Sequence, residues 1–214
     1  MHGKFITLEG GEGCGKSTQA KLLIEYLQQK GIDTVLTKEP GGTEVGKVLR
    51  QLLVTGDKDK FDAISECLLY YADRRIHLTQ LVWPAMQSGK WVISDRYADS
   101  TEAYQYYGYN KRVDYDILQK MYQIVAGSFK PDLTLILDIE PEKGMQRSFA
   151  KAKEMNVKEL RFESRELEFH HNLRNGFLEI AKRDPERCAV LNADKNIDEL
   201  HQDIIKTVEE RLGI

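Results

Sequence analysis

Nine residues near the amino terminus, GGEGCGKST at positions 10–18, have the types and spacing of a phosphate-binding loop. Their frame is Gly10-x4-Gly15-Lys16-Ser17, placed between an apolar run and a segment with helical spacing. In this frame the glycines let backbone N–H groups converge, Lys16 reaches the β- and γ-phosphates, and Ser17 ligates Mg²⁺. Such a pattern arises by chance in roughly one chain of this length in a hundred. It predicts nucleoside triphosphate binding without specifying the reaction.

The loop contains two residues that phosphate binding does not require, Glu12 and Cys14. A side chain in the middle of such a loop can project away from the backbone cradle, so Glu12 need not face the phosphates; the alternative is a solvent-facing residue. A thiol near a helix amino terminus can have a lowered pKa, so alkylation of Cys14 would block nucleotide binding, unless Cys14 is merely a small filler. The candidate nucleotide contacts are Gly10, Gly11, Glu12, Gly13, Cys14, Gly15, Lys16, Ser17 and Thr18.

A second candidate group follows the apolar run WVISD, residues 91–95. Ligands of open parallel sheets gather at the carboxyl ends of the strands, so Asp95 and Arg96 are expected near the phosphate-binding loop. Asp95 is a candidate Mg²⁺ ligand, and the planar guanidinium of Arg96 suits a phosphate. The alternative is an ordinary surface ion pair.

Tyr70 and Arg74 are four residues apart in a helical segment and therefore share one face. An aromatic plane beside a guanidinium can hold a nucleobase by stacking and hydrogen bonding. Spacing alone favours a simpler arrangement, with Tyr70 facing the core and Arg74 exposed.

The segment at about 150–166 is highly charged and only weakly apolar. It is either a lid or, as charge alone favours, a solvated helix end. If it closes as a lid, Arg147, Arg161 and Arg165 could reach the phosphates that are transferred, because phosphoryl transfer needs cations where charge develops.

Neither metal-ligand spacing nor a nucleic-acid surface is evident elsewhere. His170 and His171 are expected to be exposed helix residues. A cluster of tyrosines is typical of a platform for single strands, but no basic stripe surrounds it and the formal net charge is -3. We therefore expect no nucleic-acid partner. The tyrosines are Tyr104, Tyr106, Tyr107 and Tyr109.

Short apolar runs alternate with helical segments along the whole chain. Strands are predicted at 5–9, 33–39, 91–95, 132–139 and 188–192. Helices are predicted at 17–31, 44–54, 62–88, 114–127, from 141 onward, at 163–183 and at 196–212, with Pro84 bending the third or starting a new piece. The pattern indicates an α/β fold, one five-stranded parallel sheet covered by helices on both faces in a three-layer sandwich. Residues 1–214 are expected to form a single domain; strand order does not follow from the pattern.

Composition limits the cellular setting. Cys14, Cys67 and Cys188 are an odd, scattered set, which argues against disulfides or zinc. The sequence has no signal-peptide pattern and no stretch of about 18 apolar residues. We expect a cytoplasmic protein without a membrane partner.

The motifs together closely resemble the thymidylate kinase family, of the bacterial type. The resemblance covers almost the whole chain, in the family's order, and its most specific parts are the EPGGT, ADR and DRY-x-x-ST-x-AYQ blocks. It implies a P-loop kinase that converts ATP and dTMP to ADP and dTDP with Mg²⁺, usually as a homodimer.

The resemblance also implies individual roles. Glu12 would accept a hydrogen bond from the dTMP 3′-hydroxyl, Arg96 would hold its phosphate, and Arg74 would bind thymine O4. The expected dTMP contacts are Glu12, Pro40, Tyr70, Arg74, Arg96, Ser100, Thr101, Tyr104 and Gln105; those acting in catalysis are Glu12, Lys16, Arg96 and Arg161. Tyr70 would stack on the base and Tyr104 would crowd the sugar 2′ position. Arg147 would contact ATP, and Ser17 and Asp95 would hold the metal.

Gly13 marks the bacterial subtype, because the other subtype has a catalytic arginine there; Arg161 of the lid would supply this charge. Three departures stand out. Tyr70 replaces a phenylalanine, Leu160 replaces an aspartate, and Tyr106-Tyr107 replace glycines.

Two alternatives remain open. One is another P-loop pyrimidine nucleotide or deoxynucleoside kinase. The other is a regulatory NTP-binding module that switches on hydrolysis, although no segment stands out as a switch loop.

Overall fold

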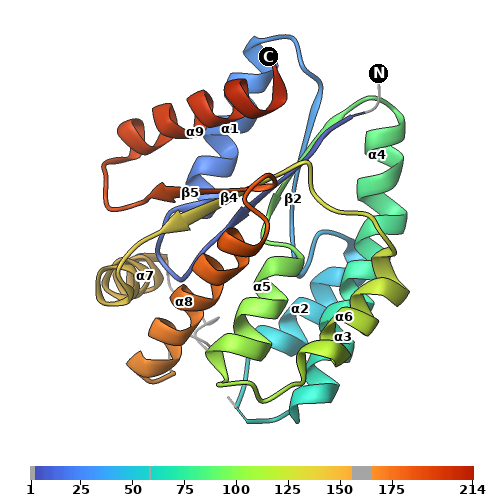
Figure 1. Cartoon of the computed structure of the whole chain (residues 1–214), viewed down its shortest axis with the longest axis vertical. Helices are drawn as coiled ribbons and strands as arrows, with labels where there is room; N and C mark the ends of the chain where they lie inside the picture. Colours follow the sequence, from blue (N-terminus) through green and yellow to red (C-terminus); the bar gives the residue numbers. More distant parts are fainter. Residues whose placement is uncertain (1–2, 58, 156–164) are drawn as a thin grey trace.

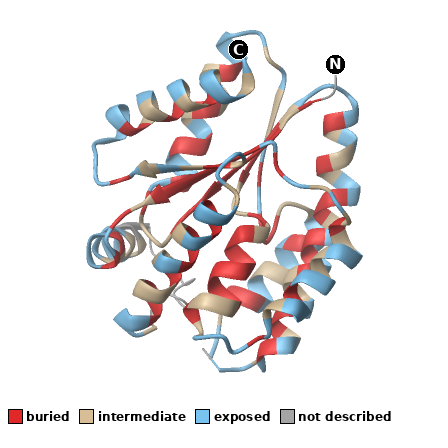
Figure 2. Ribbon diagram, in the orientation of Figure 1, coloured by how far each residue is buried: buried red, intermediate tan, exposed pale blue. Residues whose placement is uncertain are grey.

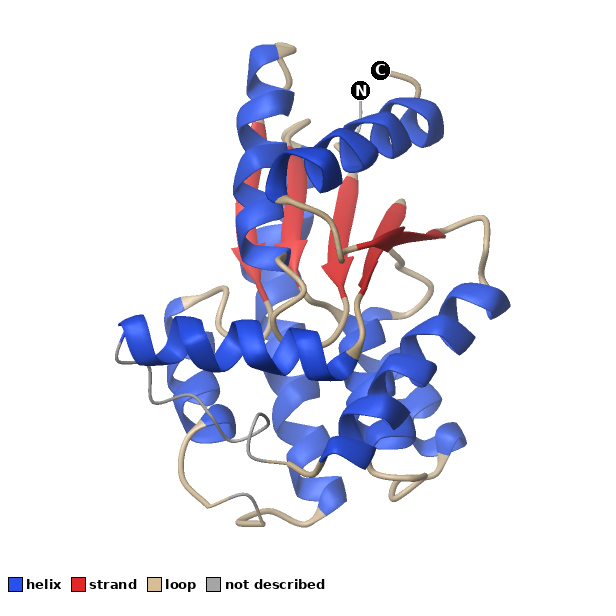
Figure 3. Ribbon diagram, turned by 90° about the vertical axis from the view of Figure 1, so that its left-hand side faces the viewer, coloured by secondary structure: helices blue, strands red, loops and turns tan. Residues whose placement is uncertain are grey.

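The computed structural model describes residues 3–57, 59–155 and 165–214. Its centre is one parallel sheet in the order β2-β3-β1-β4-β5, as Figures 1 and 3 show. The strands are β1 (Phe5–Glu9), β2 (Thr34–Lys38), β3 (Trp91–Asp95), β4 (Leu133–Asp138) and β5 (Cys188–Asn192). The five predicted parallel strands are confirmed, and the structure adds their order.

The described helices match the predicted ones within a few residues, except that two adjacent helices, α5 and η2, were not predicted. They are α1 (Lys16–Gln29), α2 (Glu44–Val54), α3 (Ala63–His77), η1 (Leu78–Val82), α4 (Trp83–Gln87), α5 (Ala98–Glu102), η2 (Ala103–Gly108), α6 (Tyr115–Ala126), α7 (Pro141–Met155), α8 (Leu167–Arg183) and α9 (Ile197–Leu212). Pro84 does start a new piece, in the first turn of α4. The sequence analysis missed α5 and η2. The buried face of α5 is polar, with Ser100, Thr101 and Glu102 all buried, and shows no apolar periodicity; η2 continues directly from it.

Helices cover both faces of the sheet (Figure 2). On one face, α1 and α9 pack on the alternate residues Ile6 and Leu8 of β1 together with β4. On the other face, two further apolar clusters contain Phe5 with η1 and α4, and Ile136 with α8. Since strands buried on both faces leave only their ends open, the ends are where a ligand can bind.

The loop after β1 is held by direct backbone packing against α7. A Cβ built on Gly13 would lie 1.9 Å from the carbonyl oxygen of Gly144, and one built on Gly144 would lie 2.4 Å from that of Glu12. Gly13 also has a φ of +67°, where side chains are disfavoured. These positions therefore require glycine on both sides of the contact.

A turn at residues 39–42 follows β2 and is anchored by α3. The Glu39–Pro40 peptide is cis, and the N–H of Gly41 donates to Asp73 at 3.2 Å. Glu39 accepts from Arg74 Nε at 2.9 Å and pairs with His77 Nδ1 at 2.7 Å. All four polar side chains of this group, Glu39, Asp73, Arg74 and His77, are buried. Burial first, and repulsion from Glu39 second, raise the pKa of Asp73 to about 7.

This shift predicts how stability depends on pH. Between about pH 4 and pH 7 the folded protein binds a proton at Asp73 that the unfolded chain releases, so this carboxyl lowers the free energy of unfolding as pH rises. Asp73→Asn cannot ionise and should therefore gain stability relative to the native chain on going from pH 5 to pH 8. Urea denaturation at both pH values measures the difference, with the exposed Asp198→Asn as control. A difference that does not change with pH would contradict the assignment.

Candidate active site

The phosphate-binding loop has the geometry that its sequence predicts. Lys16 is buried, and its Nζ donates to the carbonyl oxygens of Gly10 at 3.1 Å and Gly11 at 2.7 Å. Gly15, in the left-handed conformation, precedes α1, and no side chain caps that helix end. The amino terminus of α1 thus faces the loop with the partial positive charge that favours phosphate.

A cleft of about 700 Å³ extends from this loop, within the range of nucleotide-sized sites. Its lining joins the loop to Asp95 and Arg96 at one side and to Arg147, Ala193 and Asn196 at the other. Arg147 donates to the carbonyl oxygen of Ala193 at 2.9 Å and lies 3.5 Å from Asp194. The predicted contacts of residues 12–18 and Arg147 therefore line one cleft.

Two oxygen ligands suitable for Mg²⁺ meet at the edge of this cleft. β3 ends beside β1, with Asp95 opposite Leu8, and Ser17 Oγ donates to Asp95 Oδ2 at 2.5 Å. Among the described residues there is no cluster of three or more His, Cys, Asp or Glu that could hold a metal alone. The pair fits Mg²⁺, which usually takes one or two protein ligands and completes its shell with water and phosphate oxygens.

Arg96 is fixed in an uncommon conformation at the next position. Its φ is +73°, a region that non-glycine residues seldom adopt. Its Nη1 donates to the carbonyl oxygen of Gly10 at 2.9 Å and to Ser100 Oγ at 3.0 Å. Its guanidinium lies over the ring of Tyr104, 5.1 Å from the centroid. The phosphate-binding loop, the end of β3 and α5 therefore meet at the Arg96 guanidinium.

Glu12 faces this cation rather than solvent. Its carboxylate lies 3.1 Å from Arg96 Nη2 and accepts a hydrogen bond from the Tyr104 hydroxyl. Burial alone would raise the pKa of Glu12, but the nearby cations, Arg96 first and then Lys16, hold it below its ordinary value. The carboxylate is therefore ionised at neutral pH and remains an acceptor.

Arg74 forms the deepest part of the second half of the site. The exposed arginine favoured by spacing is wrong, because only 1% of Arg74 is exposed, and the half-buried Tyr70 packs against an apolar cluster. Arg74 lies between the rings of Tyr71 and Tyr97 and donates to Thr101 Oγ1 at 2.8 Å. Its Nη1 and both polar atoms of buried Gln105 make no hydrogen bond to any residue that the structure describes. Buried polar atoms normally have partners, so they are suited to a polar ligand.

The structure also places Pro40 and Arg165, two further residues named in the sequence analysis. The carbonyl oxygen of Pro40 accepts from Arg50 at 3.1 Å. Arg165 contacts Asp59 at 3.2 Å and lies over the Tyr109 ring. Arg161 and Leu160 lie outside the described residues, as does most of the segment predicted as a lid.

The structure corrects the prediction for His170 and narrows the alternatives for Cys14. His170 is buried, at 3% exposure, and contributes to the low pKa of Glu12, whereas His171 is half-buried and contacts Glu142 at 3.0 Å. Cys14 is 1% exposed and belongs to a core cluster, which favours the filler interpretation over a reactive thiol. Tyr104 is buried and Tyr106, Tyr107 and Tyr109 pack on apolar clusters, so the tyrosines form no open platform.

Sequence reasoning also missed the polar groups behind the site. Glu9 ends β1 and is fully buried, and Asp99 is buried against Arg187. Glu39 and His77 hold Arg74 from behind. A glutamate at the carboxyl end of a buried strand was the available signal for Glu9.

Comparisons with known proteins identify relatives over nearly the whole chain. The family model described as thymidylate kinase matches residues 8–204. A thymidylate kinase of Caulobacter vibrioides is 42% identical over 212 residues, covering 99% of both chains. One of Magnetococcus marinus is 42% identical over 214 residues, covering 100% of this chain and 99% of the other. The crystal structure of thymidylate kinase from Ehrlichia chaffeensis superposes with a TM-score of 0.77 at 34% identity, covering 98% and 99% of the two chains.

These matches span the phosphate-binding loop, the Arg96 turn and the Arg74 helix in one continuous alignment range. At this identity and coverage the likeness is not confined to the fold. The chain belongs to the thymidylate kinase family.

Proposed function

We propose that the protein transfers the γ-phosphate of ATP to dTMP and so forms dTDP, a step toward dTTP. The observation that carries the proposal is the arrangement of two half-sites around Glu12 and Arg96. One half is the phosphate-binding loop, and the other is the buried pocket of Arg74 and Gln105. Family membership supports the same reaction.

The donor half uses backbone and lysine. ATP phosphates occupy the loop, Lys16 turns from the loop carbonyls toward the β- and γ-phosphates, and Arg147 contacts the nucleotide from α7. Ser17 and Asp95 hold Mg²⁺, which neutralises charge on the phosphates when bound. Residues 10–18 thereby position the donor.

The acceptor half distinguishes base, sugar and phosphate. Arg74 donates to thymine O4, a contact that the amino group of cytosine would not reward. Gln105, Ser100 and Thr101 line the base, Pro40 shapes the pocket and Tyr70 stacks. Glu12 accepts from the 3′-hydroxyl, Tyr104 crowds the 2′ position, and Arg96 holds the phosphate that attacks.

Phosphoryl transfer needs positioning and cations more than covalent chemistry. Arg96 aligns the attacking phosphate while Lys16 stabilises charge that develops on the transferred group. We assign the further cation to Arg161 of a lid at about 150–166, whose closure excludes water. The rest of the rate then depends on how rigidly these groups are held.

An acceptor panel tests the function. Coupled measurement of ADP formation across dTMP, dUMP, dCMP, CMP and thymidine should give dTMP the highest kcat/KM, by at least about tenfold, or about 1.4 kcal/mol. A better acceptor among the others would identify another P-loop nucleotide or nucleoside kinase. Nucleotide-dependent partner binding without transfer to any acceptor would favour a regulatory module.

Two variants test the proposed roles of Glu12 and Arg161 separately. Glu12→Gln keeps the shape but loses the charge that faces Arg96, so it should lower dTMP phosphorylation and leave the Kd for ATP within about twofold. Arg161→Gln should lower kcat much more than dTMP affinity, because it acts on the transition state. Steady-state kinetics and calorimetry measure both. Wild-type turnover in Glu12→Gln, or equal loss of binding and rate in Arg161→Gln, would contradict these roles.

We also propose a homodimer in the cytoplasm. Three unpaired, buried cysteines fit a reducing compartment, and within the described ranges no helix combines the length and apolarity needed to cross a bilayer. The two neighbouring helices α2 and α3 expose apolar side chains with helical spacing: Val45, Val48, Leu52, Ile64 and Leu68. Such a continuous apolar face is typical of an interface between identical subunits.

The dimer prediction has a direct test. Val48 is 67% exposed and Leu68 is 54% exposed, so Val48→Glu with Leu68→Glu should place charges in the interface and give a monomer by light scattering. Val190→Glu, on the edge strand β5, is the control and should remain dimeric. A native chain that is monomeric at micromolar concentration would refute the proposal.

A further inference from the structure

A buried carboxylate lies behind Arg96 and takes no part in the reaction described above. Glu9 is the last residue of β1 and is fully buried. Its Oε1 accepts from the N–H of Tyr97 at 2.7 Å, and its Oε2 accepts from Ser100 Oγ at 2.5 Å. Glu9 therefore binds the chain immediately after Arg96 and the first turn of α5.

The Ser100 hydroxyl links Glu9 to Arg96 through two hydrogen bonds. Because the single hydroxyl hydrogen of Ser100 is donated to Glu9, its lone pairs are free to accept from Arg96 Nη1 at 3.0 Å. The same serine cannot keep this orientation if Glu9 becomes a donor. One carboxylate thus fixes both the guanidinium and the peptide that follows it.

The backbone at Arg96 needs such support. Its φ of +73° is unfavourable for any residue other than glycine. The next backbone N–H in the chain, that of Tyr97, donates to Glu9. Tyr97 precedes α5 without a side-chain cap of its own. Glu9 supplies from β1 the acceptor for the N-cap N–H that the glutamate of a capping box would otherwise provide.

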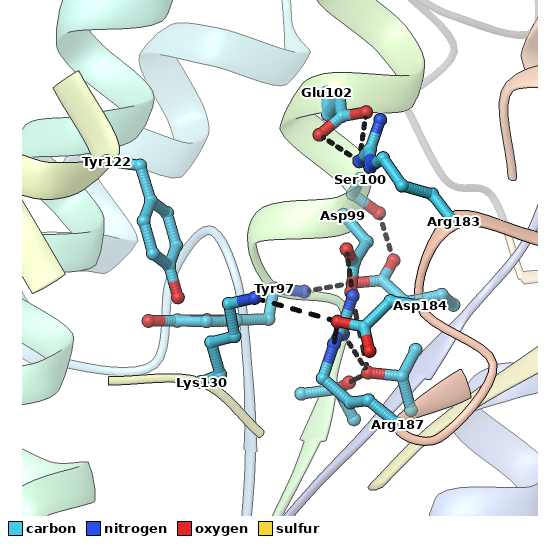
Figure 4. Close-up of polar contacts among 12 residues, drawn as sticks. Tyr97, Asp99, Ser100, Glu102, Tyr122, Lys130, Arg183, Asp184 and Arg187 are labelled. Atoms are coloured by element: carbon cyan, nitrogen blue, oxygen red, sulfur yellow. Dashed lines mark hydrogen bonds and ion pairs between the residues drawn. The ribbon is translucent and has the colours of Figure 1, made fainter. Parts of the chain in front are cut away.

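Two charged side chains, Arg96 and Asp99, act on the Glu9 carboxyl with opposite effects. Figure 4 shows Tyr97, Asp99 and Ser100 on one stretch of chain, with Asp99 turned to Arg187. Asp99 is bound by both terminal nitrogens of Arg187, at 2.6 and 2.9 Å, so this arginine offsets part of its charge.

We propose that Glu9 is a positioning residue for the acceptor phosphate: it sets the orientation of Arg96 through Ser100 and the Tyr97 peptide. This inference rests on the proposed function, in which Arg96 holds the phosphate of dTMP. Glu9 itself touches no substrate.

The decisive measurement compares dTMP with thymidine, which has no phosphate for Arg96. Glu9→Gln has the same shape, but its amide donates to Ser100 and reverses that hydroxyl. Calorimetry should show about tenfold weaker binding of dTMP, while binding of thymidine and of ATP stays within about twofold. A general loss of structure would weaken all three ligands.

Helix α5 offers a matched control in Glu102. This carboxylate is also buried and accepts from Arg183 at 2.7 and 2.9 Å (Figure 4), whereas Arg96 donates to Gly10, Ser100 and Glu12. Glu102→Gln should leave the preference for dTMP over thymidine within about twofold. If Glu102→Gln reduces that preference as much as Glu9→Gln does, the inference is overturned.

A double-variant cycle tests the route through Ser100. Ser100→Ala should reduce the preference for dTMP over thymidine, and Glu9→Gln added to it should reduce that preference little further. If Glu9→Gln does not fold, Ser100→Ala alone decides, and an unchanged preference refutes the route.

Arg96→Lys distinguishes failure of the proposed function from failure of this inference. An unchanged preference in Arg96→Lys refutes the proposed phosphate site, whereas a loss there with none in Glu9→Gln refutes only this inference.

The pH dependence gives an independent readout. Burial first, and repulsion from Asp99 second, raise the pKa of Glu9 to about 7, against Ser100 and Arg96, which lower it. The other titratable or charged groups near this carboxyl are Arg187 on Asp99, Glu12 and Asp95 on Arg96, and Cys188 of β5. The ratio of dTMP Kd values between Glu9→Gln and the native chain should therefore fall toward one from pH 8 to pH 6. Using a ratio cancels the titration of the ligand phosphate. A ratio that stays constant contradicts the proposal.

Discussion

The contact between Glu12 and Arg96 is the interaction on which the site depends. It joins the loop after β1 to the turn after β3, two strands that are neighbours in the sheet. Both side chains are largely buried, so each charge requires the other. Because the pair holds the loop and the turn together, the donor and acceptor halves are in register before either substrate binds.

Similar pairs recur behind the site. Glu39 binds Arg74, Asp99 binds Arg187 and Glu102 binds Arg183, in each case across elements distant in sequence. Buried ion pairs add little net stability compared with apolar packing, but removal of one partner typically costs about 3–5 kcal/mol. Their value here is orientation: an arginine fixed by a carboxylate on one side presents its remaining nitrogens in one direction. The clearest case is Nη1 of Arg74, for which the described part of the chain offers no acceptor.

The fold could be predicted from sequence because its signals are local. Apolar runs such as LTLILD of β4 and the helical spacing of α1 depend on neighbouring residues only. The order of the strands could not be derived, since it depends on long-range pairing. The phosphate loop and Asp95–Arg96 were recognisable from type and place. Glu9, Glu39 and His170 were not, because a buried polar residue looks like an exposed one until its partners are known, and α5 was missed for the same reason.

The contact between Gly13 and Gly144 has a mechanical consequence. Two backbones touch there without side chains between them, and a contact of this kind has no flexible atoms to absorb a displacement. Backbone atoms of both segments therefore oppose a displacement of the loop toward α7. The far end of that helix, at Met155, leads directly into the residues that precede Arg161. One helix, α7, therefore joins the backbone contact at the nucleotide loop to Met155.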